Sequence, residues 1–118
     1  MRNKQVTIDG RQATLDDWLN DRIGDKLRKA SIIVSRTGIP LVLYRNSIEE
    51  SEHVVQEEVA TINEKYVVIE VLTYGGFLPI SFQQQCVFTL HEFPTWIMKR
   101  SRDLFLTCIK NLDQQLGQ

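Results

Sequence analysis

The stretch "SIIVSRTGIPLVLY" (Ser31–Tyr44) decides how the first half of the chain is interpreted. Two β-branched and aliphatic runs, Ile32–Val34 and Ile39–Tyr44, flank the polar segment Arg36–Gly38, and both are too short for helices. The pattern predicts two strands joined by a turn. Because Pro40 has no backbone N–H for a ladder, the second strand should lie at a sheet edge or begin after this proline.

The residues before this stretch predict a short arm and then a helix. Gln5–Ile8 is typical of a strand and Asp9-Gly10 of a turn, within an N-terminal arm of residues 1–13. Thr14 is a good helix N-cap, and Gly24 leaves open whether the helix is continuous, kinks or ends early. The apolar residues of this helix recur at three- and four-residue spacing: Leu15, Trp18, Leu19, Ile23 and Leu27.

A second helix is predicted after the opening stretch. Ser47 and Glu50 match the S-x-x-E capping box, which favours a helix from Ile48 to about Glu64. The apolar stripe of this helix would be Ile48, Val55, Val59 and Ile62.

Three further strands are predicted in the second half of the chain. Tyr66–Thr73 carries the strongest strand pattern, and Tyr74–Gly76 supplies the glycines of a tight turn. Phe77–Phe82 is a fourth strand that contains Pro79, the polar run Gln83–Gln85 predicts a turn, and Cys86–His91 is a fifth strand.

The last predicted element is a helix, because Pro94 suits a first helical turn. Its core stripe would be Ile97, Leu104, Cys108, Leu112 and Leu116, widened by Phe105 and Ile109. The predicted order is therefore α-β-β-α-β-β-β-α in one domain of residues 14–118. This is an α+β fold, a five-stranded antiparallel sheet with helices packed on its faces.

Composition excludes several classes of function. The formal net charge of -1 and pI near 6.1 argue against a nucleic-acid binder. No apolar run approaches the ~20 residues that a bilayer span needs. The start of the chain lacks the apolar region of a secretory signal, and Cys86 and Cys108 are expected to be free thiols. These features predict a cytoplasmic protein.

Residues with catalytic or metal-binding chemistry are few. His53 and His91 lack a second histidine or cysteine at metal-ligand spacing. In "HEFPT" at His91, a threonine replaces the second histidine of H-E-x-x-H. Cys86 and His91 lie five positions apart on one predicted strand and would point to opposite faces. The sequence predicts no catalytic, cofactor-binding or metal-binding residue and no enzyme.

Charge and hydrophobicity point instead to a surface for another protein. Residues 46–70 contain seven acids against one base, and residues 93–110 contain four bases against one acid. The acidic and the basic segment are either two solvent-exposed faces or opposite charges that orient the protein as it docks onto a partner. Tyr66–Thr73 is apolar on both faces, as expected of an internal strand, a strand buried on both sides, or an edge strand paired across a dimer axis.

Residues 15–112 resemble the roadblock family of small longin- and profilin-like modules, which includes dynein light chains and bacterial or archaeal partners of small GTPases. The resemblance lies in "LDDWLNDRIGDKLRKASIIVSRTGIPLVLY", the helix from Ile48, the strand "YVVIEVL" and the closing strand-helix unit. It implies a dimer that pairs third strands and packs second helices, here Tyr66–Thr73 and Ile48–Glu64. Pro79 departs from the family pattern, since that strand should be internal.

The predicted function is a non-catalytic, dimeric regulatory or scaffold module without cofactor. The resemblance implies that it binds itself or a paralogous subunit through the second helix and third strand, and a small GTPase or motor complex. The predicted partner-facing residues are Val54, Val55, Glu58, Ile62, Val68 and Glu70. Two alternatives remain open: an immunity or antidote protein that occludes a basic toxin surface, and a small-molecule sensor with a pocket near Trp96 and His91.

Overall fold

The structure is a computed structural model that describes residues 5–8, 11–75 and 78–117. Side chains are described for residues 14–48, 50–75 and 84–117. The predicted turn at Asp9-Gly10 lies outside the described residues, as do Gly76 of the predicted glycine turn and Phe77 of the predicted fourth strand.

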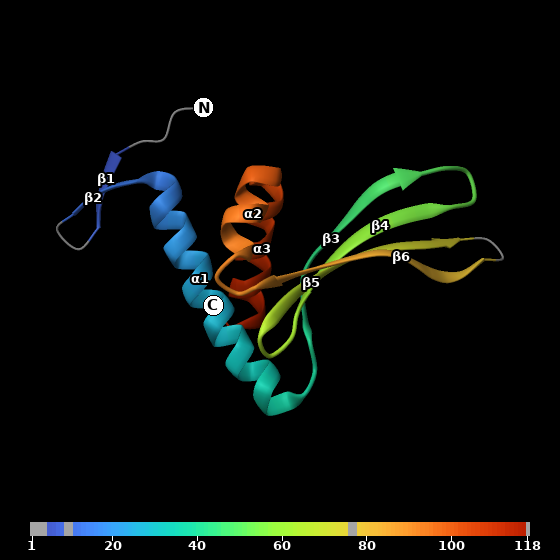
Figure 1. Cartoon of the computed structure of the whole chain (residues 1–118), viewed down its shortest axis with the longest axis horizontal. Coiled ribbons are helices and arrows are strands. Elements are labelled where there is room, and N and C mark those ends of the chain that lie inside the picture. Colours follow the sequence, from blue (N-terminus) through green and yellow to red (C-terminus); the bar gives the residue numbers. More distant parts are fainter. Residues whose placement is uncertain (1–4, 9–10, 76–77, 118) are drawn as a thin grey trace.

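The described chain folds as one long N-terminal helix, a four-stranded antiparallel meander sheet and two C-terminal helices packed on that sheet (Figure 1). A separate two-stranded sheet pairs β1 with β2 before the first helix. The predicted α+β class is confirmed, but the sheet has four strands in the order β3-β4-β5-β6 and no helix interrupts it. The elements are β1 Gln5–Ile8, β2 Arg11–Thr14, α1 Leu15–Thr37, β3 Leu41–Glu50, β4 Val55–Ile62, β5 Tyr66–Gly75, β6 Leu78–Thr89, α2 Phe93–Arg100 and α3 Arg102–Gln115.

The predicted hairpin in the opening stretch is wrong, because α1 continues through Ile32–Val34 to Thr37. Thr14 caps the helix as predicted, accepting a hydrogen bond from the Asp17 N–H at 3.1 Å. The helix ends at Gly38, which has φ 72° and donates its N–H to the Val34 carbonyl at 2.8 Å. The buried side chains of α1 recur at four-, three- and four-residue intervals across the β-branched run: Ile23, Leu27, Ala30 and Val34.

The predicted helix from Ile48 to Glu64 is also wrong. These residues form the end of β3, a turn at residues 51–54 and the strand β4. Ser47 and Glu50 do interact, but the Ser47 hydroxyl donates to Glu50 Oε1 at 2.7 Å in a strand and caps no helix. Over a few positions, the same apolar residues fit both the 3.6-residue period of a helix and the two-residue period of a strand. Pairing of this segment with a strand on each side selects the strand.

The predicted fourth and fifth strands correspond to one strand in the structure, β6. The predicted strand Tyr66–Thr73 is confirmed as part of β5. β6 runs without interruption from Leu78 to Thr89, so the predicted turn at Gln83–Gln85 is wrong, although the register shifts by one residue between Gln84 and Phe82. Pro79 is tolerated because β6 is an edge strand, and Pro40 precedes the other edge strand, β3, as expected.

The predicted single C-terminal helix is two helices that meet at Ser101. Ser101 has extended dihedrals, φ -162° and ψ 113°, and its N–H donates to the Ile97 carbonyl at the end of α2. Its hydroxyl then accepts a hydrogen bond from the Leu104 N–H at 3.2 Å and caps α3. One serine therefore ends one helix and starts the next, which turns the chain back onto the sheet.

The hydrophobic core lies between the helices and one face of one end of the sheet. The fully buried aromatic residues Phe93 and Phe105 pack in a cluster with strand residues such as Ile62 and Val67. The other end of the sheet, with the turn at residues 51–54, projects beyond the helices (Figure 1), and the molecule measures 57 × 38 × 24 Å. Among the described helices, none combines the length and apolar character required to span a membrane.

We predict that Gly75→Ala destabilises the protein more than Gly38→Ala. Both glycines have positive φ, 135° and 72°, but a Cβ at Gly75 would overlap the carbonyl oxygen of His53 and lie 3.2 Å from Val54 Cα. A Cβ at Gly38 meets nothing within 4 Å. Urea unfolding should show a loss of about 1 kcal/mol for Gly38→Ala, from φ strain alone, and about 3 kcal/mol for Gly75→Ala. Equal losses would contradict the close approach of the two turns.

Candidate functional site

One face of the sheet carries apolar side chains that are not part of the core. In an antiparallel pair, residues directly opposite each other share a face. Ile62 and Val67 are such a pair and face the helices, so the next pair, Thr61 and Val68, faces away. The same register places Val42 and Val87 beside them. We call the outward-facing surface of the sheet the open face. Its first row across the strands is Val42, Thr61, Val68 and Val87, and its second row is Arg45, Val59, Glu70 and Gln85. Beyond these rows lie two pairs of β4 and β5 residues, Glu57 with Leu72 and Val55 with Tyr74.

The open face has a small apolar cluster of its own. Val59 is only 6% exposed, yet neither it nor Val42, Val68 or Val87 belongs to the core cluster or packs against it. At the rim, Val87 is 54% exposed and Tyr66, one row beyond Val68, is 45% exposed. Apolar residues at the surface are ordinary when scattered, but here valines from β3, β5 and β6 lie in one row, with Thr61 of β4 between them.

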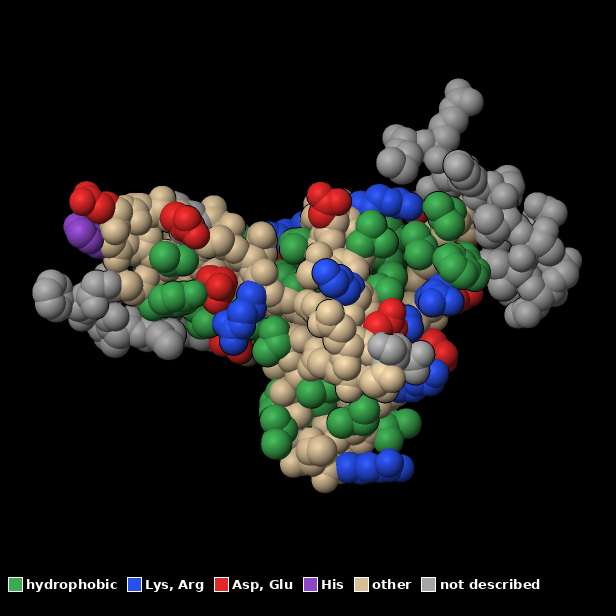
Figure 2. All heavy atoms as spheres, turned by 180° about the vertical axis from the view of Figure 1, so that it is seen from behind, with side chains coloured by type: hydrophobic (Ala, Val, Ile, Leu, Met, Phe, Trp, Pro, Cys, Tyr) green, Lys and Arg blue, Asp and Glu red, His purple; other side chains and the backbone are tan. Residues whose placement is uncertain are grey.

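The open face is acidic as well as apolar. Arg45 donates to Glu57 at 3.0 Å, and Glu57 also accepts a hydrogen bond from the Tyr74 hydroxyl. Partial burial, followed by that hydrogen bond, raises the pKa of Tyr74. Glu70 forms no ion pair with any residue that the structure describes. Figure 2 shows hydrophobic, acidic and basic side chains intermixed on one side of the projecting end of the sheet.

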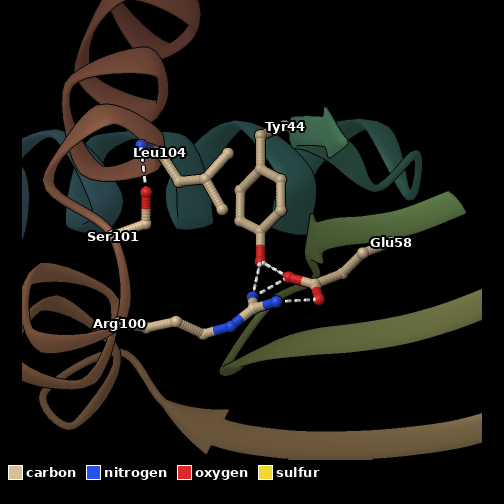
Figure 3. Close-up of polar contacts among 5 residues, drawn as sticks. All are labelled: Tyr44, Glu58, Arg100, Ser101 and Leu104. Atoms are coloured by element: carbon tan, nitrogen blue, oxygen red, sulfur yellow. Dashed lines mark hydrogen bonds and ion pairs between the residues drawn. The ribbon is translucent and has the colours of Figure 1, made fainter. Parts of the chain in front are cut away.

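On the face toward the helices, a buried carboxylate links the sheet to the end of α2 (Figure 3). Glu58 is 5% exposed and accepts two hydrogen bonds from the Arg100 guanidinium and one from the Tyr44 hydroxyl. Arg100 Nη1 also lies 3.4 Å from the Tyr44 oxygen, and its guanidinium stacks over Trp96 with 5.4 Å to the ring centroid. A bidentate arginine–carboxylate pair fixes geometry as well as charge.

Burial and hydrogen bonding raise the pKa values of Tyr44 and Arg100 in this cluster. Burial, followed by the hydrogen bond to Glu58, raises the pKa of Tyr44 far above its ordinary value. The hydrogen bonds to Glu58 raise the pKa of Arg100. At neutral pH Tyr44 therefore remains a neutral donor and Arg100 a cation, and their hydrogen bonds to Glu58 join β3, β4 and α2.

The structure separates the residues that the sequence predicted as partner-facing. Glu58 and Ile62 are buried against the helices, at 5% and 0% exposure. Val68 and Glu70 are half-buried on the open face, on neighbouring strand positions. Val54 and Val55 are half-buried at the turn between β3 and β4, at the projecting end of the sheet. The period of two in β4 was the signal that could have assigned Glu58 and Val59 to opposite faces.

Groups suited to nucleophilic or metal chemistry lie apart in the described chain. Cys86 is exposed on β6, whereas Cys108 is fully buried in α3, and burial raises the pKa of its thiol to about 12. Among the described residues, no group of three or more histidine, cysteine, aspartate or glutamate side chains is placed to hold a metal ion.

A cavity of about 460 Å³ lies between α1 and the corner that joins β6 to α2. From α1 it is lined by Asn20, Asp21, Gly24 and Arg28. From the corner it is lined by Leu90, His91 and Pro94. His91, which the sensor alternative placed beside a pocket together with Trp96, lines a concave surface that also contains an aspartate and an arginine; the lining residues opposite it come from α1 and do not include Trp96.

Comparisons of the chain with models of protein families, with curated proteins and with solved structures found no match.

We predict that Glu58→Gln destabilises the fold far more than Glu57→Gln on the opposite face. Glutamine leaves Arg100 without its carboxylate in a partly buried site, which should lower the free energy of unfolding by about 1 to 3 kcal/mol. Glu57 pairs with Arg45, whose side chain is 56% exposed, so its loss should cost less than about 1 kcal/mol. Urea unfolding of the two variants measures the difference, and equal values would contradict the linking role of Glu58.

We predict that the two thiols differ strongly in reactivity. An aromatic disulfide reagent should modify Cys86 at least about 100-fold faster than Cys108, because Cys108 is buried and its raised pKa keeps it protonated. Absorbance should show one fast equivalent in the native state and two in urea. The Cys86→Ser variant should lose the fast phase, and a fast phase that survives this change would contradict the assignment.

Proposed function

We propose that this protein is a non-catalytic binding module that docks its open face onto a basic, partly apolar surface of another protein. The single observation that supports this is the row of apolar side chains outside the core, Val42, Val68 and Val87, on a sheet whose helices pack against its other face. Such a surface loses water-exposed apolar area when a partner covers it.

Charge indicates the chemistry of the partner. The open face carries Arg45 against Glu57 and Glu70, and Arg45 is already paired with Glu57. Glu70 lies directly opposite Val59, at the centre of the apolar cluster. Covering an unpaired carboxylate is costly unless the partner supplies a cation, so a lysine or arginine beside an apolar patch is the complement that fits.

The partner could take several forms within this chemistry. A second copy placed face to face would bring the two Glu70 carboxylates close together, so we favour a different protein over self-association. A small GTPase or a paralogous subunit, as the roadblock resemblance implies, and a basic toxin, as in the antidote alternative, are candidates for that protein. The test below distinguishes these cases by the identity and charge of what is captured.

We predict that a photo-crosslinking residue at Val87 captures a partner in the native cell, whereas the same residue at Leu106 does not. Both positions are exposed, at 54% and 44%, but Leu106 lies on α3 and outside the open face. Capture from Val87 should fall at least about tenfold when Glu70→Lys is added, because the change reverses the charge at the centre of the face. Mass spectrometry of the crosslinked product measures both effects.

Two results would contradict the proposal. Equal capture from Val87 and Leu106 would show that the contact does not use the open face. Light scattering that shows a stable homodimer, broken by Glu70→Lys, would replace a foreign partner with a second copy.

A further inference from the structure

We infer that the cavity between α1 and the β6–α2 corner binds a small zwitterion with an apolar body, such as an α-amino acid. Its volume of about 460 Å³ falls in the range of about 300–1,000 Å³ that is usual for small-molecule sites. This site is separate from the open face and independent of the proposed protein docking.

The α1 wall presents opposite charges, on Asp21 and Arg28, about two helical turns apart along the backbone. Asn20, Gly24 and Arg28 follow one another at intervals of four residues and so lie on one side of the helix. Asp21 is next to Asn20 and also lines the cavity. Arg28 extends back over Gly24: its Nη1 lies 3.5 Å from where a Gly24 Cβ would be. The Arg28 side chain thus points back along α1, and Asp21 and Arg28 give the lining of one small cavity an anionic and a cationic group.

Gly24 keeps this wall open at the cost of helix stability. A glycine inside a helix is about 1 kcal/mol less favourable than alanine. Nothing inside the fold requires it, since a Cβ at this position would make only an ordinary contact with the Arg28 side chain. Its φ is not positive, and the helix is continuous through it. The position where α1 lacks a side chain is therefore part of the wall of the cavity.

The opposite wall is fixed in place by a reciprocal pair of hydrogen bonds. The Thr89 N–H donates to Glu92 Oε1 at 3.0 Å, and the Glu92 N–H donates to Thr89 Oγ1 at 3.1 Å. These bonds lower the pKa of Glu92, so its carboxylate persists at neutral pH. The two residues bracket Leu90 and His91, which are thus held against the cavity. Leu90 and Pro94 supply apolar surface, and His91 supplies a polar ring.

These groups favour a ligand with two charges over one with a single charge. A carboxylate can pair with the Arg28 guanidinium. In the structure this guanidinium lies 3.1 Å from the Asp25 carboxylate, and both side chains of this ion pair are more than 60% exposed. Such an exposed pair is weak and easily exchanged. A primary ammonium can pair with Asp21 and Asn20, and the apolar body can lie on Leu90 and Pro94.

The test uses three probes that share one apolar body: phenylalanine, phenylacetate and phenethylamine. Each is titrated into the full ¹⁵N-labelled chain up to about 10 mM, a range that detects millimolar affinity. We expect saturable shifts at the amides of Gly24 and His91. Phenylalanine should bind at least about fivefold more tightly than phenylacetate, which retains only the carboxylate, and than phenethylamine, which retains only the ammonium.

Variants connect the shifts to the cavity. Gly24→Leu should raise the melting temperature, because leucine is a better helix former, and should abolish binding by filling the cavity. Arg28→Gln should weaken phenylalanine binding at least about fivefold, whereas Arg36→Gln, at the far end of the same helix, should leave it unchanged.

Three outcomes would overturn the inference. The first is no saturable shift with any probe. The second is equal affinity for all three probes, which would exclude recognition of two charges. The third is phenylalanine binding that Gly24→Leu leaves intact, which would place the ligand elsewhere. None of these bears on the docking of the open face, which is tested by crosslinking.

Discussion

The packing of three helices against one face of a meander sheet is the constraint on which the rest of the structure depends. Ile23 and Leu27 of α1, with Phe93, Ile97 and Phe105 of the C-terminal helices, enclose Ala60, Ile62, Val67 and Ile69. Burial of these side chains is the main favourable term in folding. A sheet has two faces, and the chain covers one of them over part of its length. Whatever the open face does follows from this arrangement.

The Glu58–Arg100–Tyr44 cluster ties the sheet to the C-terminal end of α2. It joins β3 and β4 to the last residue of α2 (Figure 3). A buried carboxylate needs a cation, and among the residues that the structure describes Arg100, the last residue of α2, supplies it. The arginine is itself oriented by Trp96, which stacks on Phe88 of β6 at 4.5 Å. The same residues thus fix how α2 meets the sheet and, through the β6–α2 corner, the wall of the cavity.

The candidate sites were partly predictable. Val68 and Glu70 were identified from the apolar pattern on both sides of β5, and they lie on the open face. Glu58 was predicted to face a partner because a helix was expected where β4 lies, whereas in β4 its side chain is buried toward the helices. A pocket beside His91 was one of the alternatives from sequence, but its α1 wall was not, because Gly24 and His91 are 67 positions apart and meet only through the packing of α1 on the β6–α2 corner.

The sequence by itself determined the elements whose signals are local. The capping box at Thr14, the strand at Tyr66 and the helix start near Pro94 depend on nearby residues. Only the tertiary structure decided whether Ile32–Val34 and residues 48–64 form helix or strand, because the intrinsic preferences for the two conformations differ by little there. Ile32–Val34 forms helix because Ala30 and Val34 extend the buried side of α1. In residues 48–64, β4 gains a hydrogen-bonded neighbour on each side, and local preference does not outweigh pairing with two strands.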